Sequence, residues 1–429
     1  MNAKWMIAGP GVLAVAGGLP WVVGYVTEQQ WHQATAEVND AQPFLRMETD
    51  NYERGILGAR FRGSVNLINP ETGESQKLAY RANVTHGVTG SLMDFQPEDG
   101  WAAGDSDWFS GEEPKLTLET RLWGTAVLEL EAPQMTLTDP DTGETLASSG
   151  GLARIEVSEA GSQADALMVW PGVTLSGPDL DIQVSDSRLE QTMGHLTGEV
   201  WTGSGEIAVE SVAVTPAAEA PFMLQGISVL SSSEPVNDGE RLDSRMTFEV
   251  AGVSTADERY GPQRLVFALS GLDVAARSHL TESLSSMQAL AITQASGGPQ
   301  QFEQQMAAMQ QVNAAVRDLA AAGFSVGFPE LTVTTPEGVI EGSARIAHPE
   351  LTADQKAEML MAMQQLTGKM DLSLPVALAE EYPEFRLQLA PLIKQGLLVE
   401  QGDSLVLDAS MKDLVLDVNG VEIPLPPLL

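Results

Sequence analysis

The fold is decided by stretches such as Met246-Thr247-Phe248-Glu249-Val250 and Leu265-Val266-Phe267-Ala268-Leu269. In the first, apolar side chains alternate with polar ones, which is the period of a β-strand with two different faces. In the second, Leu265, Phe267 and Leu269 share one face of the strand. Strands with one apolar and one polar face are typical of an antiparallel sheet that is half buried and half in contact with water.

The same alternation recurs on both sides of these two stretches, so the pattern predicts a strand-dominated chain. Further runs with apolar residues on one face are Phe61, Gly63, Val65 and Leu67; Leu116, Leu118, Thr120 and Leu122; Ile207 and Val209; Leu405 and Leu407; Leu414, Leu416 and Val418; and Val421 and Ile423. Two nearly identical segments, residues 69–74 and 139–144, each contain Pro and Gly and predict hairpin loops. Reading Asp139 and Asp141 as a Ca²⁺ loop is not favoured, because the remaining acidic ligands of such a loop are missing.

Helical sequence interrupts the strands once at length, over residues 276–323. Apolar residues recur there at helical spacing and Gly297-Gly298-Pro299 divides the segment, which predicts a helical hairpin. Residues 352–355 form a capping box that predicts a third helix, and a fourth is expected over residues 383–394. The hairpin has two interpretations. It either covers one face of the sheet, or acts as a lid over an apolar groove, where methionines such as Met287 adapt to varied ligands.

The N-terminal segment from Trp5 to Val26 contains no charged residue. Its length is sufficient for a helix to cross a bilayer, and Lys4 before it with Glu28 after it would leave the body translocated. This predicts an N-terminal membrane helix over residues 5–26, followed by a short helix over residues 28–41. A cleaved signal peptide and a buried core helix are the two alternative interpretations.

The composition excludes several classes of function. Among 429 residues there is no cysteine, and 59 acidic residues face 23 basic ones, for a formal charge of −36. Disulfides, thiolate metal sites and cysteine nucleophiles are therefore absent, and a general nucleic-acid binder is not expected. The acidic residues are spread along the chain, which favours adaptation of the surface to salty surroundings over the alternative of a cationic partner or Ca²⁺.

Motifs that carry chemistry are missing from the sequence. The five histidines do not form a metal-binding motif, and the sequence has no nucleophile elbow, no phosphate-binding loop and no dinucleotide fingerprint. We therefore expect no catalytic residue, no cofactor and no metal, and a protein that is not an enzyme.

Short motifs in a fixed order resemble a known family. They are Asn51-Tyr52-Glu53-Arg54-Gly55, then Thr85-His86-Gly87, and near the end Leu414–Val418 followed by Asn419-Gly420. This layout resembles the YdgA-like family of Gram-negative envelope proteins, which has no assigned activity. Val88 stands where that family usually has proline after His-Gly. The resemblance implies an inner-membrane anchor, a periplasmic body and a strand-rich mixed fold, and it brings no catalytic residues.

The family-motif positions are the candidate site residues, and each also has a structural interpretation in a turn or at a strand end. They are Tyr52, Arg54, Gly55, His86, Gly87, Asn419 and Gly420. Asn-Gly between two alternating runs is a strong hairpin signal.

These observations together predict an α+β, strand-dominated fold. A large antiparallel sheet, curved or elongated, would carry a helical hairpin insertion and an N-terminal membrane helix. The expected regions are a membrane anchor (1–27), a strand-rich periplasmic region (28–275), the helical hairpin (276–323) and a mixed region that completes the sheet (324–429).

The expected function is that of a single-pass inner-membrane protein with its body in the periplasm. It would bind a lipid or another envelope component, or act as a scaffold for a membrane complex. The alternative is an envelope glycan or lipid hydrolase that uses carboxylates.

Overall fold

The computed structural model describes residues 4–41, 44–69, 74–102, 107–109, 111–198, 200–292, 299–358 and 365–426. The chain divides into two compact units, Met1–Thr174 and Leu175–Leu429, and each is described by itself.

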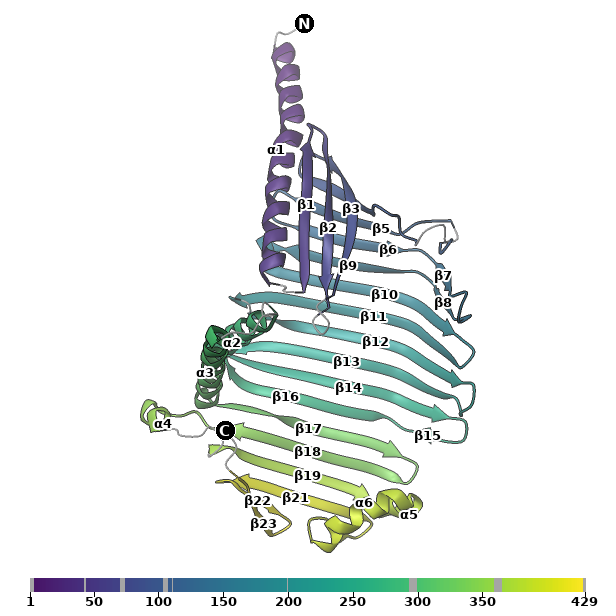
Figure 1. The fold of residues 1–429 in the computed structure, drawn as a ribbon, viewed down its shortest axis with the longest axis vertical. Helices are drawn as coiled ribbons and strands as arrows, with labels where there is room; N and C mark the ends of the chain where they lie inside the picture. Colours follow the sequence, from purple (N-terminus) through teal and green to yellow (C-terminus); the bar gives the residue numbers. More distant parts are fainter. Residues whose placement is uncertain are drawn as a thin grey trace. The chain divides into compact units, whose positions relative to one another are not determined.

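Unit 1 consists of one long helix and an antiparallel sheet (Figure 1). Its elements are α1 (Lys4–Ala41), β1 (Leu45–Arg54), β2 (Gly58–Ile68), β3 (Ser75–His86), β4 (Gly90–Pro97), β5 (Lys115–Arg121), β6 (Ala126–Ala132), β7 (Met135–Thr138), β8 (Thr145–Ser148), β9 (Gly151–Ser158), the short 3-10 turn η1 (Glu159–Gly161) and β10 (Gln163–Ser176). Neighbouring strands pair antiparallel in the order β1-β2-β3-β4-β5-β6-β9-β10, and β7 and β8 form a hairpin. The predicted loop over residues 139–144 joins β7 to β8, whereas most of the loop over residues 69–74 lies outside the described residues.

The predicted N-terminal membrane helix over residues 5–26 is wrong as a membrane span. In the part of the chain that the structure describes, no helix is long and apolar enough to cross a bilayer. The side chains of residues 5–19 lie outside that part. Helix α1 instead runs without a break through both predicted segments, from Lys4 to Ala41, and lies against β1–β4.

The physical reason is a stripe of side chains at four-residue spacing on α1. Val23, Thr27, Trp31 and Thr35 are buried, because one face of the helix packs on the sheet. Trp31 Nε1 donates a hydrogen bond to Thr49 Oγ1 at 2.9 Å. Over residues 20–39, where the side chains are described, one face of α1 is thus in contact with protein.

The core of unit 1 lies between α1 and one face of β1–β4. Phe61 and Met93 are fully buried there, and the Trp31 ring lies 5.1 Å from that of Phe61 and 5.6 Å from that of Phe95. Aromatic pairs at such distances stabilise a core beyond the area that they bury. The side of β2 predicted to be apolar, with Phe61, Gly63 and Val65, therefore faces this core.

Unit 2 consists of antiparallel strands with helices beside them. Its elements are β11 (Leu180–Thr197), β12 (Val200–Pro216), β13 (Phe222–Val236), the 3-10 turn η2 (Asn237–Gly239), β14 (Arg241–Thr255), β15 (Arg259–Tyr260), β16 (Gln263–Asp273), α2 (Val274–Ile292), α3 (Pro299–Ala322), β17 (Phe324–Thr335), β18 (Gly338–His348), α4 (Ala353–Glu358), β19 (Thr367–Pro375), α5 (Val376–Glu381), α6 (Pro383–Lys394), β20 (Val399–Gln401), β21 (Ser404–Lys412), β22 (Val415–Val418) and β23 (Val421–Pro424). The strands pair in the order β11-β12-β13-β14-β16-β17-β18-β19-β21-β22-β23, with β15 on β14 and β20 on β21.

The predicted strand-dominated, antiparallel architecture is confirmed within each unit. Helices α2 and α3 occupy the segment of the predicted helical hairpin and contact β16 (Figure 1). At Thr352 the capping box is present, because Thr352 Oγ1 accepts from the Gln355 backbone N–H while Gln355 Oε1 accepts from that of Thr352. Helix α5 was not expected from the sequence.

Candidate functional site

Unit 2 presents one broad side of its sheet that carries no charge. Because residues directly opposite in antiparallel strands point to the same side, the register defines rows of side chains that cross the sheet. One row contains Leu189, Ile207, Val229, Phe248, Leu265, Leu331, Gly342, Leu372 and Leu407, each opposite the next. We call the side of the sheet that holds this row the apolar face.

Two further rows run beside the first on the apolar face. One of these two rows consists of two parts, Ser231, Met246 and Phe267, and then Phe328, Ala344, Met370 and Ala409. The two parts are in contact through the rings of Phe267 and Phe328, whose centroids lie 5.5 Å apart. The other contains Ser244, Leu269, Val326, Ile346, Gly368 and Met411. None of these residues is charged.

The opposite side of the same strands is strongly charged. Arg188, Glu249, Arg264 and Glu341 lie there, and Arg264 forms ion pairs with Glu249 and Glu330. Although the chain contains 59 acidic residues, none of them lies in the rows of the apolar face. A sheet with one uncharged and one charged side is typical of a sheet that is buried on its uncharged side.

The apolar face is nevertheless partly exposed. Six of its large side chains are exposed to between 37% and 45%, namely Ile207, Met246, Phe248, Phe328, Ile346 and Met370. Among the described helices, α5 and α6 cover the end near Leu372 and Leu407, while α2 and α3 contact the sheet at β16. A contiguous exposed apolar surface marks an interaction site.

The size of the apolar face suits an elongated ligand. The first row crosses nine strands. At about 4.8 Å between strands, a row of that width extends about 38 Å, and three rows spaced two residues apart are about 14 Å wide. A concave region of about 250 Å³ beside these rows is lined by Met193, Trp201, Met246 and Phe267, with Arg245 from the opposite side at its border.

In unit 1 five family-motif positions lie in or next to the hairpin turns between β1 and β2 and between β3 and β4. Gly55 N–H donates to Gly58 O at 2.7 Å in the turn between β1 and β2, and Gly87 N–H donates to Gly90 O at 2.8 Å in the turn between β3 and β4. The His86 backbone N–H donates to Leu57 O and joins the two turns.

His86 is buried under α1, with an exposed fraction of 5%. Its Nδ1 lies 2.9 Å from Ser91 Oγ, which in turn lies 2.8 Å from Thr27 Oγ1 on the helix. Burial, and secondarily the positive charge of Arg54, lowers the pKa of the His86 imidazole. A histidine beside a serine hydroxyl is one element of a nucleophilic site. Here the helix covers both groups, so the pair acts as a polar contact between α1 and the sheet.

Arg54 and Tyr52 make the neighbouring contacts with α1. The Arg54 guanidinium pairs with Glu28 at 2.8 Å and lies 5.4 Å and 5.3 Å from the ring centroids of Trp21 and Tyr25. Cations over aromatic faces stabilise such junctions. Tyr52 stacks on Phe61, and burial raises its pKa to about 12. Arg54 directly and His86 through Ser91 thus tie the helix to the sheet, while Gly55 and Gly87 form the turns beside them.

Asn419 and Gly420 belong to unit 2 and form the turn between β22 and β23. Both have positive φ, 51° and 84°, as the two-residue hairpin turn requires. Asn419 Nδ2 donates to the carbonyls of Leu397 and Val406, each at 3.0 Å, and its Oδ1 accepts from the Asp408 backbone N–H at 3.2 Å. The side chain therefore fastens three segments of the C-terminal region together.

Two features were not recognised from the sequence. The buried stripe of α1 has a visible signal, the four-residue spacing of Val23, Thr27 and Trp31. The apolar face has only a partial one, because the runs around Ile207, Phe248 and Leu265 predict strands but not which residues lie opposite each other.

Comparison with known proteins places the chain in a family but assigns it no activity. No curated protein and no solved structure matches the chain. Nothing in the comparisons tests the YdgA-like name or an envelope role. Residues 4–426 match the model of a family described as bacterial protein of unknown function (DUF945), and the chain therefore belongs to that family.

Proposed function

We propose that this protein binds the acyl chain of a lipid on the apolar face of unit 2. The observation that carries the proposal is the uncharged, partly exposed set of rows through Ile207, Phe248 and Met246. Filling such a surface with hydrocarbon removes apolar area from water, at about 25 cal/mol per Å².

The shape and chemistry of the face favour hydrocarbon over a protein segment. Protein strands bind at a sheet edge, where backbone groups are free, whereas the apolar face offers only side chains. An acyl chain needs no hydrogen bonds and reaches about 15 Å, half of a hydrocarbon core of about 30 Å, which fits within the length of one row. The methionines Met246, Met370 and Met411 let the surface adapt to chains of different shape.

Two other functions considered from the sequence receive less support. The hydrolase would need two convergent carboxylates, and the rows of the apolar face contain none. A scaffold would need a protein partner, which the exposed rows alone do not specify. The location of the body in the periplasm stays a prediction of the sequence.

The experiment measures binding of 11-(dansylamino)undecanoic acid to the full-length protein by fluorescence. Ile207→Glu places a charge on the apolar face, whereas Leu230→Glu places one on the opposite side of the neighbouring strand. The two residues are matched, because they are 44% and 41% exposed and both are branched aliphatic side chains.

We expect saturable binding to the unaltered protein and at least about tenfold weaker binding to Ile207→Glu, equivalent to about 1.4 kcal/mol. Leu230→Glu should bind within about twofold of the unaltered protein. Equal weakening by both variants, or no saturable binding at all, would contradict the proposal. A monomer–dimer equilibrium abolished only by Ile207→Glu, without fatty-acid binding, would assign the face to a second copy instead.

A further inference from the structure

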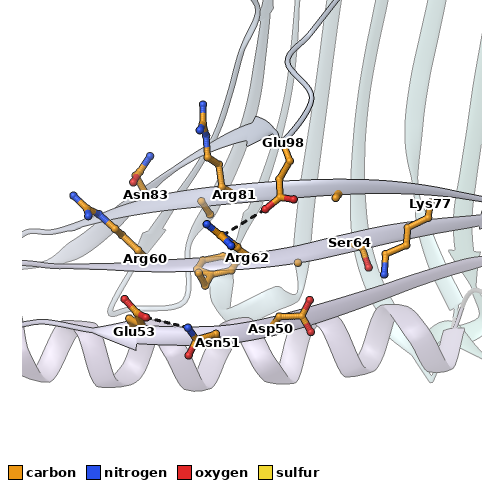
Figure 2. Close-up of a pocket in the computed structure, with 14 residues that line it drawn as sticks. Asp50, Asn51, Glu53, Arg60, Arg62, Ser64, Lys77, Arg81, Asn83 and Glu98 are labelled. Carbon is orange, nitrogen blue, oxygen red and sulfur yellow. Dashed lines mark hydrogen bonds and ion pairs between the residues drawn. The ribbon is translucent and has the colours of Figure 1, made fainter. Parts of the chain in front are cut away.

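Unit 1 carries a second surface, on the side of β1–β3 that faces away from α1. Residues alternate along these strands, so Phe61, Tyr80 and Ala82 point into the core while Arg60, Arg62 and Arg81 point outward. The outward side chains line a concave region of about 810 Å³. Figure 2 shows them on neighbouring strands.

Basic residues are concentrated in this region. Its lining contains Arg60, Arg62, Lys77 and Arg81 against three carboxylates, although acids outnumber bases 59 to 23 in the whole chain. Such a local excess of positive charge attracts anions toward a protein whose remaining surface repels them.

The register places two of the cations against each other. Arg62 lies directly opposite Arg81, and like charges at directly opposite positions destabilise a pair of strands. Arg60 lies two residues from Arg62 on the same side of β2, opposite Asn83. Local choices that oppose stability concentrate at functional sites.

Four cations against three carboxylates leave one net positive charge in this lining. Glu98 pairs with Arg62 at 3.4 Å, in an exposed contact of the kind that contributes little. Glu53 accepts a hydrogen bond from Asn51 at 2.9 Å, and Asp50 lies opposite Arg62. Arg60 lies directly opposite Glu53 on β1, and among the described residues neither Arg60 nor Lys77 forms an ion pair.

A buried hydroxyl in the same lining lacks a partner. Ser64 is exposed to only 1%, and among the described residues its Oγ has no hydrogen-bond partner. A buried polar group without a partner is costly and requires an explanation. A ligand oxygen in the concave region would supply the missing acceptor.

We propose that the outward side of β1–β3 binds a phosphate group, with Arg62 and Arg81 as its main ligands and Ser64 as a donor. Guanidinium groups bind phosphate in a planar, two-point geometry. A doubly charged anion would offset the repulsion between Arg62 and Arg81 and displace Glu98 more effectively than a singly charged carboxylate. The phosphate is either free in solution or the headgroup of a lipid.

The experiment titrates the full-length protein by calorimetry at low ionic strength with three probes. Sodium pyrophosphate represents free phosphate, dihexanoyl phosphatidic acid represents the headgroup, and dihexanoylglycerol is the matched lipid without phosphate. The test variant is Arg62→Gln with Arg81→Gln. The control is Arg188→Gln, which removes an arginine that is ion-paired with Glu190 on the sheet of unit 2.

We expect saturable binding of at least one phosphate probe, weakened tenfold or more by the double variant and less than twofold by the control. Ser64→Ala should weaken binding about fivefold, as the loss of one hydrogen bond implies. Binding of pyrophosphate would identify free phosphate as the source, and binding of phosphatidic acid alone would identify a headgroup.

Three results would overturn the proposal. They are no saturable binding of either phosphate probe, equal affinity of the double variant and the unaltered protein, or equal binding of phosphatidic acid and dihexanoylglycerol without pyrophosphate binding. The last result would assign lipid binding to the apolar face alone. If the double variant does not fold by circular dichroism, Ser64→Ala and Arg60→Gln decide by the same criteria.

Discussion

Replacing Gly24 by alanine tests how helix α1 is held on the sheet. Gly24 faces the His86 ring, and a Cβ at this position would lie 2.7 Å from His86 Nε2 and 2.8 Å from its Cδ2. The ring cannot retreat freely, because it is buried and its Nδ1 is held by Ser91 Oγ at 2.9 Å.

The magnitude follows from three opposing contributions. Alanine in place of glycine within a helix stabilises by about 1 kcal/mol. Overpacking costs about 1–3 kcal/mol, and the disturbed hydrogen bond between His86 and Ser91 about 1 kcal/mol. We therefore expect Gly24→Ala to destabilise the contact between α1 and the sheet by about 1–3 kcal/mol, although it is a helix-favouring substitution.

The assay is hydrogen exchange of the peptides that cover residues 22–35, read by mass spectrometry. At tenfold for each 1.4 kcal/mol, exchange should be about 5- to 150-fold faster. Gln29→Ala, at an exposed position of the same helix, should leave the exchange rate unchanged. In the double variant Gly24→Ala with His86→Ala the collision is removed, so its effect should be smaller than the sum of the single effects. Slower exchange in Gly24→Ala, or strict additivity in the double variant, would refute the reasoning.

Three further outcomes follow from the same contacts. Because burial lowers the pKa of His86, the neutral form is favoured in the folded protein, so its contribution to stability is fully present above about pH 6.5 and is lost as the pH falls below that value. Urea unfolding at pH 8 and pH 5 should show this loss of stability, and the difference between the two pH values should be smaller for His86→Gln. Burial raises the pKa of Tyr80 to about 12, so stability should fall as the pH rises above about 10, and absorbance at alkaline pH should show this ionisation only together with unfolding. The same titration with Tyr80→Phe should show a smaller late step, because Tyr52 still contributes to it. Asn419→Ala should lower the free energy of unfolding by about 2–4 kcal/mol through three lost hydrogen bonds and a strained positive φ, whereas Asn419→Gly avoids the strain and should cost less in the same urea titration.

Several elements could be predicted from the sequence because their causes are local. Alternation around Phe248 and Leu265 predicts strands, since side chains of a strand point alternately to two sides. Asn419-Gly420 predicts its hairpin because both positions must adopt positive φ. The predicted bounds of the helix over residues 383–394 agree with α6, which begins with a proline in its first turn.

The candidate sites could be predicted only in part. The motif positions Arg54 and His86 were selected by resemblance, and only the structure shows that both contact α1. The phosphate site depends on the opposition of Arg62 and Arg81, which lie 19 residues apart in the chain and meet through the register of β2 and β3. No local pattern specifies that register.

The sequence by itself determined that this protein is an acidic chain without cysteine in which strands with one apolar and one polar face predominate. Those properties depend on composition and on the two-residue period of a strand. The tertiary structure decided how the apolar residues are used. At the N-terminus the sheet buries Val23, Thr27 and Trp31, so an uncharged segment that resembled a membrane span leads into a helix packed on protein. In unit 2 the pairing of distant strands aligns their apolar sides into one face, because only the register between strands determines which side chains lie beside each other.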